Sequence, residues 1–96
     1  MGSIRRVVLD VMKPHDPELV GFTDHLSAVE SVDAVTATLV ERDKEVQEVV
    51  VTLEGDTLDF EAIEAAIEEL GGAVHSVDEV ARGNRIARPG RIHKNG

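Results

Sequence analysis

The sequence predicts a ferredoxin-like α+β sandwich, a βαββαβ unit with two helices on one face of a four-stranded antiparallel sheet. Two observations support this fold class. Three short segments alternate apolar and polar residues, as half-buried strands do, and a fourth is strand-like with poorer alternation. Two others carry apolar residues at helical spacings of three and four. Because crossover connections are right-handed, the expected strand order is 4-1-3-2.

The first half of the chain contains a strand, a loop and a helix. Residues 4–12 are rich in β-branched side chains and form the first expected strand. Its inward side chains are expected to be Val7, Leu9 and Val11. Two prolines end this strand, so residues 13–17 are expected to form a loop. Asp16 is the expected N-cap of a helix that fades near residues 30–32. The apolar stripe of this helix consists of Leu19, Phe22, Leu26 and Val29.

The second half repeats this pattern after a hairpin. Residues 34–41 and 46–54 are expected to be strands around a charged turn at residues 42–45. Asp59 is the expected N-cap of the second helix, and the glycines at 71–72 are its stop signal. The apolar stripe of this helix consists of Phe60, Ile63, Ile67 and Leu70. The two stripes can be buried jointly on one face of the sheet.

The fourth expected strand, residues 73–80, contains most of the candidate site residues. Polar residues interrupt both of its faces, so the alternation assigns no inward face. Asp78 and Glu79 are adjacent acids, whose repulsion would be relieved by a cation such as Ca²⁺ or Mg²⁺, or by an arginine from the tail or a neighbour. Antiparallel pairing with the first strand brings His15 towards His75 and Ser76, which are the side-chain types used in acid–base and nucleophilic chemistry.

The length and charge of the chain predict one domain with a basic end. The 96 residues are enough for one domain, expected over residues 1–82, with a basic C-terminal tail over residues 83–96. The formal net charge is −9, but residues 1–80 carry −14 and residues 81–96 carry +5. The tail is therefore expected to be a loosely ordered end of opposite charge to the body.

Composition excludes several classes of function. The sequence has no cysteine, which removes disulfides, thiolate metal sites and thiol nucleophiles. No apolar run approaches the roughly 20 residues of a membrane helix, so a cytoplasmic protein without a membrane partner is expected. An acidic body argues against nucleic acid, and both aromatic residues, Phe22 and Phe60, lie on helix stripes where they cannot stack on bases.

The sheet face that carries no helix is the most unusual surface that the sequence predicts. Apolar and polar residues are mixed on it, and it is expected to display Ile4, Arg6, Val8, Asp10, Met12, Thr36, Thr38, Val40, Glu48, Val50 and Thr52. A face with this much apolar area is expected to pack against something, most simply a second copy of the chain.

Three segments of the sequence carry a resemblance to a known family. They are VLDVMKPHDP at residues 8–17, LDF at 58–60 and GGAVHSVDEV at 71–80. Over residues 4–82 the chain resembles the largely archaeal family catalogued as domain of unknown function 211. The resemblance implies a ferredoxin-like fold, assembly into homo-oligomeric rings, a bound divalent cation such as calcium, and no established activity. Carried over to this sequence, it implies cation ligands at Asp10, His15, Asp78 and Glu79.

These observations lead to an ordered set of functional expectations. The first is a non-enzymatic homo-oligomeric module that binds a divalent cation or small ligand at subunit contacts. The second is a regulatory sensor of an amino-acid-like ligand, bound near the loop at residues 13–18. The third is an enzyme that uses His15 and His75, although no complete catalytic motif is present.

Overall fold

The structure is a computed structural model that describes residues 2–83, and its elements follow the order βαββαβ. The elements are β1 (Ile4–Pro14), α1 (Leu19–Ser27), β2 (Ala34–Arg42), β3 (Val46–Glu54), α2 (Phe60–Glu69) and β4 (Ala73–Arg82). The predicted ferredoxin-like fold is confirmed. The predicted basic tail, beyond Gly83, lies outside the described residues.

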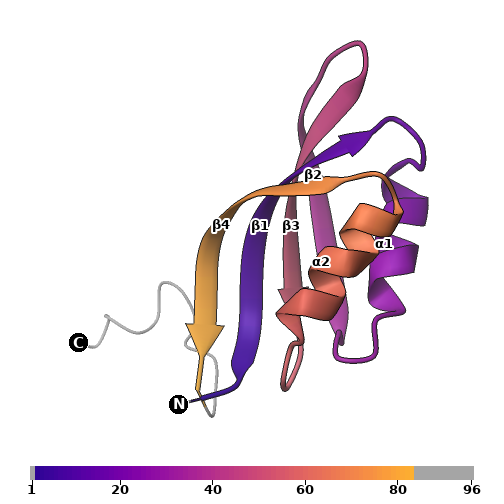
Figure 1. Cartoon of the computed structure of the whole chain (residues 1–96). Helices are drawn as coiled ribbons and strands as arrows, with labels where there is room; N and C mark the ends of the chain where they lie inside the picture. Colours follow the sequence, from indigo (N-terminus) through magenta and orange to yellow (C-terminus); the bar gives the residue numbers. More distant parts are fainter. Residues whose placement is uncertain (1, 84–96) are drawn as a thin grey trace.

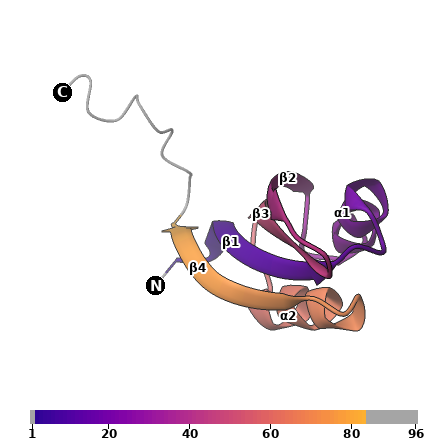
Figure 2. The same ribbon diagram turned by 90° about the horizontal axis from the view of Figure 1, so that it is seen from above.

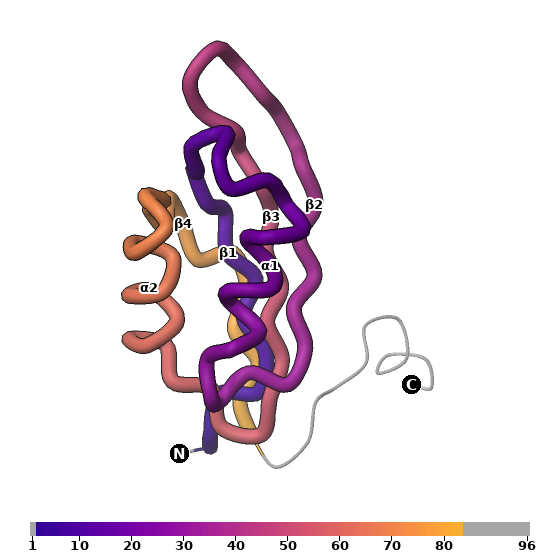
Figure 3. Tube along the Cα trace, turned by 90° about the vertical axis from the view of Figure 1, so that its right-hand side faces the viewer, coloured from indigo at the N-terminus to yellow at the C-terminus, as the bar shows by residue number. Residues whose placement is uncertain are grey.

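The four strands form one antiparallel sheet with the order β2-β3-β1-β4, which is the predicted order 4-1-3-2 read from the other edge. Helix α1 packs beside β2 and α2 beside β4. The tip of the β2–β3 hairpin projects beyond the other strands (Figures 1 and 3). The hairpin tip lies near the loop that leads into α1, since His15 of that loop contacts the Asp43 carbonyl oxygen.

The core lies between the helices and one face of the sheet. The predicted inward residues of the first and third strands are buried, namely Val7, Leu9, Val11, Val49, Val51 and Leu53. Phe22 and Leu26 of α1 and Ile63 and Ile67 of α2 are fully buried against them. The outer members of both stripes are partly buried around this cluster. The two stripes thus share one core, as the repeated spacing predicts.

The two helices begin differently. The Asp59 side chain accepts a hydrogen bond from the Ala62 amide at 3.1 Å, so this predicted N-cap is confirmed. The prediction that Asp16 caps α1 is wrong. The N-cap is Glu18, whose side chain makes no capping hydrogen bond, and the first helical amide bond runs from Phe22 to the Glu18 carbonyl at 2.9 Å. Asp16 lies two residues too early to reach the orphan amides of the first turn. Helix α1 also ends earlier than predicted, at Ser27.

Replacing Asp59 by alanine is expected to lower the free energy of unfolding by about 1 kcal/mol, because an amide of the first turn loses its acceptor. Asp16→Ala, in the other helix entry, is the matched control and should change stability by less than about 0.5 kcal/mol. Urea denaturation of both variants measures the difference. Equal losses would show that the Asp59 cap contributes nothing specific.

Strand β1 is longer than predicted. Its pairing with β3 continues through Lys13 opposite Gln47 and Pro14 opposite Val46, so the expected loop starting at residue 13 is wrong. Pairing with β4 already stops at Met12, which leaves Pro14 with a strand on one side only. A proline is tolerated at such a place because no ladder donor is required there. The extension places Lys13 on the inward face of the sheet.

Both edge strands carry bulges. In β4, Val74, Val77 and Val80 pair with Val11, Leu9 and Val7, so the residues opposite buried partners repeat every three residues. Val74 packs against the core, whereas Val77 and Val80 are each 47% exposed. His75 and Asp78 are the extra residues, without a direct partner in β1. In β2, Val40 is an extra residue between Leu39 and Glu41. Such insertions bend a strand, and β4 curves strongly along its length (Figure 2). They also explain why the sequence of β4 shows no alternation.

The helix-free face of the sheet, called the open face below, differs from its prediction at one end. Ile4 packs against the core instead, because the register of β1 against β4 shifts by one residue between Ile4 and Arg6. Four residues of this face are partly exposed, namely Asp10, Met12, Glu48 and Val50.

Among residues 2–83, neither helix is long and apolar enough to cross a bilayer.

Candidate functional site

Two carboxyl groups lie side by side on the open face. In the sheet register Asp10 pairs with Val50 and Met12 pairs with Glu48, so Asp10 and Glu48 are diagonal neighbours on the two central strands. Asp10 Oδ1 is buried and has no hydrogen-bond partner among the described residues. Glu41 of β2 stands opposite Glu48 on its other side. Three acids therefore gather at one end of the open face.

The charge state of Glu48 reflects this crowding. A hydrogen bond shared with the Asp10 carboxyl is the largest cause that raises the pKa of Glu48, and repulsion from Asp10, desolvation and Glu41 add to it, while His75 opposes it. The pKa of Glu48 is higher in the folded chain than in the unfolded chain, so this group contributes stability at pH values below its unfolded pKa. This support is lost as the pH rises through the folded-state value. Ionisation of Glu48 therefore destabilises the folded chain.

A shallow hollow adjoins this acidic cluster. It has a volume of about 140 Å³ and lies over the open-face side of the hairpin. Its lining residues are Met12, Glu41, Asp43, Val46 and Glu48. Oxygen donors are the ligands that hard cations such as Ca²⁺ and Mg²⁺ prefer, so the cluster has the chemistry of a cation site.

Glu79 lies elsewhere on the open face and has its own partner. Its carboxylate is 3.1 Å from the Arg6 guanidinium, which also lies 3.8 Å from Glu54. The repulsion between Asp78 and Glu79 was expected to be relieved by a cation, by the tail or by a neighbour. Arg6 of the adjacent strand β1 supplies this relief inside the domain for Glu79. Partly exposed ion pairs of this kind contribute about 0–1 kcal/mol each.

The remaining candidates of β4 are at its bulges. The Ser76 hydroxyl donates to Asp78 Oδ1 at 2.8 Å, so each group partly satisfies the other. Asp78 and His75 are both exposed, and His75 is close enough to Glu48 to lower its pKa. His75 and Ser76, which pairs directly with Asp10, are thus the members of the predicted β4 set that lie near the acidic cluster.

His15 belongs to a different neighbourhood. Its Nε2 atom is 2.8 Å from the carbonyl oxygen of Asp43, in the turn between β2 and β3. The Asp43 carboxylate accepts hydrogen bonds from the Val46 amide at 2.9 Å and the Glu45 amide at 3.0 Å, and these two bonds lower its pKa. His15 therefore ties the β1–α1 loop to the hairpin, whereas His75 lies over the sheet.

The structure does not bring the predicted cation ligands together. Asp10 is on the open face, His15 is at the hairpin turn, Asp78 is at a bulge and Glu79 is paired with Arg6. Within residues 2–83, no three His, Asp or Glu side chains converge closely enough to hold a metal ion. Glu48 is the residue that sequence reasoning missed as a partner of Asp10. No local pattern reveals this pair, because it depends on the register of β1 against β3, two strands that no turn connects.

A second polar arrangement lies on the helix side of the sheet. Lys13 is 1% exposed and Gln47 is 4% exposed, and the Lys13 ammonium donates to Gln47 Oε1 at 2.9 Å and to the Pro14 carbonyl at 2.8 Å. The ammonium also lies 5.5 Å from the centre of the Phe22 ring. Burial lowers the pKa of Lys13, Arg42 lowers it further, and Asp16 and Glu18 oppose the change.

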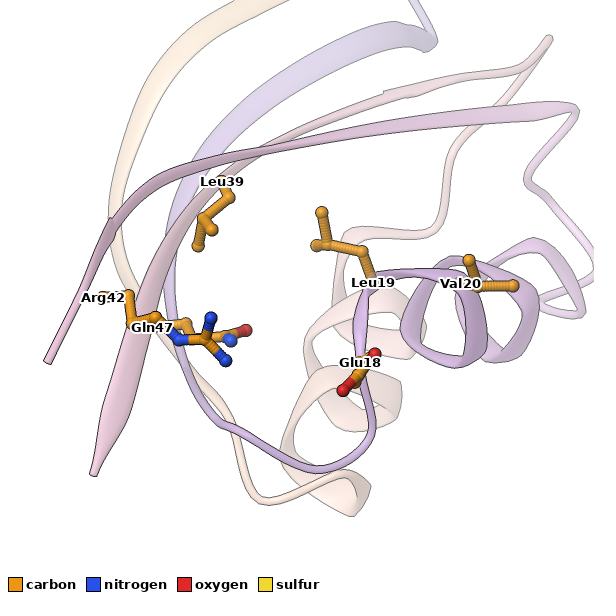
Figure 4. A pocket seen from close by; sticks show the side chains of 6 residues that line it. All are labelled: Glu18, Leu19, Val20, Leu39, Arg42 and Gln47. Atoms are coloured by element: carbon orange, nitrogen blue, oxygen red, sulfur yellow. The ribbon is translucent and has the colours of Figure 1, made fainter. Parts of the chain in front are cut away.

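A pocket of about 240 Å³ opens beside this buried pair (Figure 4). One wall is the hairpin, where Arg42 and Gln47 are paired across β2 and β3. The other wall is the start of α1. The lining residues are Glu18, Leu19, Val20, Leu39, Arg42 and Gln47. The pocket combines an apolar surface with one charged group on each side.

Comparison with known sequences agrees with the resemblance seen in the sequence. The profile of the family DUF211, described as uncharacterized ArCR, matches residues 5–95, and so extends over the basic tail that the sequence resemblance did not cover. The uncharacterized protein MJ0319 of Methanocaldococcus jannaschii is 46% identical over 86 residues, which cover 90% of this chain and 89% of that protein. The chain is therefore a member of DUF211, a family of uncharacterized proteins with an archaeal representative.

Proposed function

We propose that the chain is a non-enzymatic module that assembles with copies of itself through the open face and holds a divalent cation, with calcium as the first candidate, at the contact. The observation that carries this proposal is the buried Asp10 Oδ1 beside the Glu48 carboxyl, because the two carboxyls can share a hydrogen bond only when one of them is protonated. A carboxylate oxygen that is removed from water without a donor costs free energy unless a cation or proton compensates it.

The chemistry of the open face explains why the site would need a second copy. Ca²⁺ takes six to eight oxygen ligands, whereas Asp10 and Glu48 supply at most four oxygens. Val8, Met12 and Val50 are partly exposed on the same face, and their burial would add a hydrophobic contribution to the contact. A second copy would supply both the missing ligands and the apolar cover.

The experiment is light scattering of the full chain at micromolar concentration, with calcium and with EDTA. Oligomers are expected with calcium, and Asp10→Asn or Glu48→Gln should weaken them. Glu45→Gln, an acid in the nearby turn, is the control and should leave assembly unchanged. A monomer in both conditions, or equal assembly of Glu48→Gln and the parent protein with calcium, would contradict the proposal.

The Glu48→Gln variant separates a cation effect from simple misfolding. In EDTA at neutral pH this variant should be more stable than the parent, because it removes a charge whose pKa is raised in the folded chain. The gain should disappear below the unfolded pKa of glutamate, at about pH 4. With calcium the same variant should lose assembly, so the two measurements move in opposite directions.

A second candidate function is a regulatory sensor of a small amino-acid-like ligand. It is supported by the pocket beside Glu18, at the end of the loop where the sequence analysis places such a ligand. The third candidate, an enzyme that uses both His15 and His75, has less support because the two residues interact with different groups.

A further inference from the structure

We propose that the pocket between α1 and the β2–β3 hairpin binds a small zwitterion with an aliphatic side chain, of the size of leucine or valine. This inference rests on the sensor function proposed second and specifies its ligand, and it is independent of the cation on the open face. The pocket volume of about 240 Å³ is below the roughly 300–1,000 Å³ typical of drug-sized ligands, which fits a single amino acid.

The hairpin wall offers donors to a carboxylate. Arg42 forms no ion pair with another side chain within residues 2–83, and it lines the pocket. Gln47 stands opposite it in the register of the sheet. The two residues project from the hairpin towards the start of α1 (Figure 4). A guanidinium presents a planar fork of N–H groups that matches the geometry of a carboxylate.

The buried Lys13 fixes the orientation of the Gln47 amide. An ammonium group can only donate, so the amide must turn its oxygen towards Lys13, as the 2.9 Å contact records. The amide nitrogen then remains available as a donor on the other side. Arg42 lowers the pKa of Lys13 through charge repulsion, so the two positive charges are close enough to interact. An anionic ligand group in the pocket would therefore meet the Arg42 guanidinium and an oriented amide, while the buried Lys13 ammonium contacts that amide from inside the domain.

The helix wall offers an acceptor to an ammonium group. Glu18 is exposed, and its side chain is not used to cap α1. Figure 4 shows its carboxylate on the opposite side of the pocket from Arg42 and Gln47, and no ion pair joins Glu18 to Arg42. A ligand that carries both charges can span this gap, whereas a ligand with one charge can engage only one wall.

Aliphatic side chains form the rest of the pocket. Leu39 is 40% exposed and Val20 is 84% exposed, and both line the pocket together with Leu19. These are large apolar groups to leave in water at the mouth of a polar site. A branched aliphatic side chain on the ligand would cover them. The combination of carboxylate, ammonium and aliphatic contacts is the recognition pattern of an apolar amino acid.

The test uses NMR titration of the full chain with L-leucine. Gln47 is the single glutamine of the sequence, so its side-chain amide gives one pair of resonances that reports directly on the pocket. Leucine is expected to shift this pair saturably with a Kd of about 1 mM or below. 4-Methylpentanoate, which lacks the ammonium group, and 3-methylbutylamine, which lacks the carboxylate, should each bind about tenfold or more weakly.

Variants in the two walls complete the test. Arg42→Ala and Glu18→Ala should each weaken leucine binding about tenfold or more, while Lys44→Ala and Glu45→Ala, which lie in the same hairpin but outside this pocket, should leave it unchanged. None of these changes adds a second glutamine, so the Gln47 pair stays unique. Because all four side chains are exposed, the variants should remain folded. No saturable shift of the Gln47 pair, or equal binding of leucine and either one-charge analogue, would overturn the inference. Neither result depends on calcium or on assembly.

Discussion

Replacing Phe22 by alanine is expected to lower the free energy of unfolding by about 3–5 kcal/mol, the range measured for buried aromatic residues. Phe22 is fully buried in the core, and its ring lies 5.5 Å from the Lys13 ammonium. The variant loses the burial of the ring, leaves a cavity under the sheet and removes the π-face beside a buried cation. Since small domains are stable by only about 5–15 kcal/mol, it should be close to unfolding at 37 °C.

Phe60 provides the matched comparison for this prediction. It is the first residue of the second helical stripe, whereas Phe22 is the second residue of its own, and it is only partly buried. Phe60→Ala should therefore cost clearly less than Phe22→Ala, since less apolar area returns to water. Urea denaturation of both variants provides the measurement. A larger loss for Phe60→Ala would show that Phe22 is less buried than the structure places it.

Replacing Lys13 by methionine is expected to cost about 2 kcal/mol, although it removes a buried charge. The substitution leaves Gln47 Oε1 and the Pro14 carbonyl without their donor, and a stranded buried acceptor costs about 1–3 kcal/mol. The double variant Lys13→Met with Gln47→Leu should recover most of this loss, because both polar partners are then replaced by apolar groups. A double-mutant cycle in urea measures the coupling between the two residues.

The pH dependence of the parent protein tests the same pair. Because burial lowers the pKa of Lys13, the unfolded chain binds the proton more tightly than the folded chain does. The Lys13 charge therefore opposes folding below the folded-state pKa, and stability should rise with pH between that value and 10.5. Lys13→Met should lack this part of the rise. Parallel curves for the parent and the variant would show that Lys13 is not desolvated in the folded state.

The fold was predictable because most of its elements follow simple periodicities. The spacing of Phe22 and Leu26 in one helix and of Ile63 and Ile67 in the other was enough to identify both helices and their inward faces. The face of β4 was not predictable from alternation. Its two bulges add a residue at His75 and at Asp78, and a bulge leaves no signal in a pattern of period two.

The sites were less predictable than the fold, because each depends on pairing between distant segments. Asp10 was identified, but its neighbour Glu48 becomes visible only through the register of β1 against β3. Lys13 continues the inward series of Val7, Leu9 and Val11, but the prolines that follow made it look like the start of a loop. The sequence also could not show that Arg6 is the partner of Glu79.

The bulges in the edge strands restrict how this sheet can grow. A free strand edge is a template for another strand, and proteins that leave it flat are prone to fibrous aggregation. Here one edge is interrupted at Val40 and the other at His75 and Asp78, so neither offers an unbroken row of amides and carbonyls. Continuous β-extension from one molecule to the next is therefore disfavoured. The proposed assembly would therefore use the faces of the domain, and contacts of that kind can close into finite particles rather than open-ended fibres.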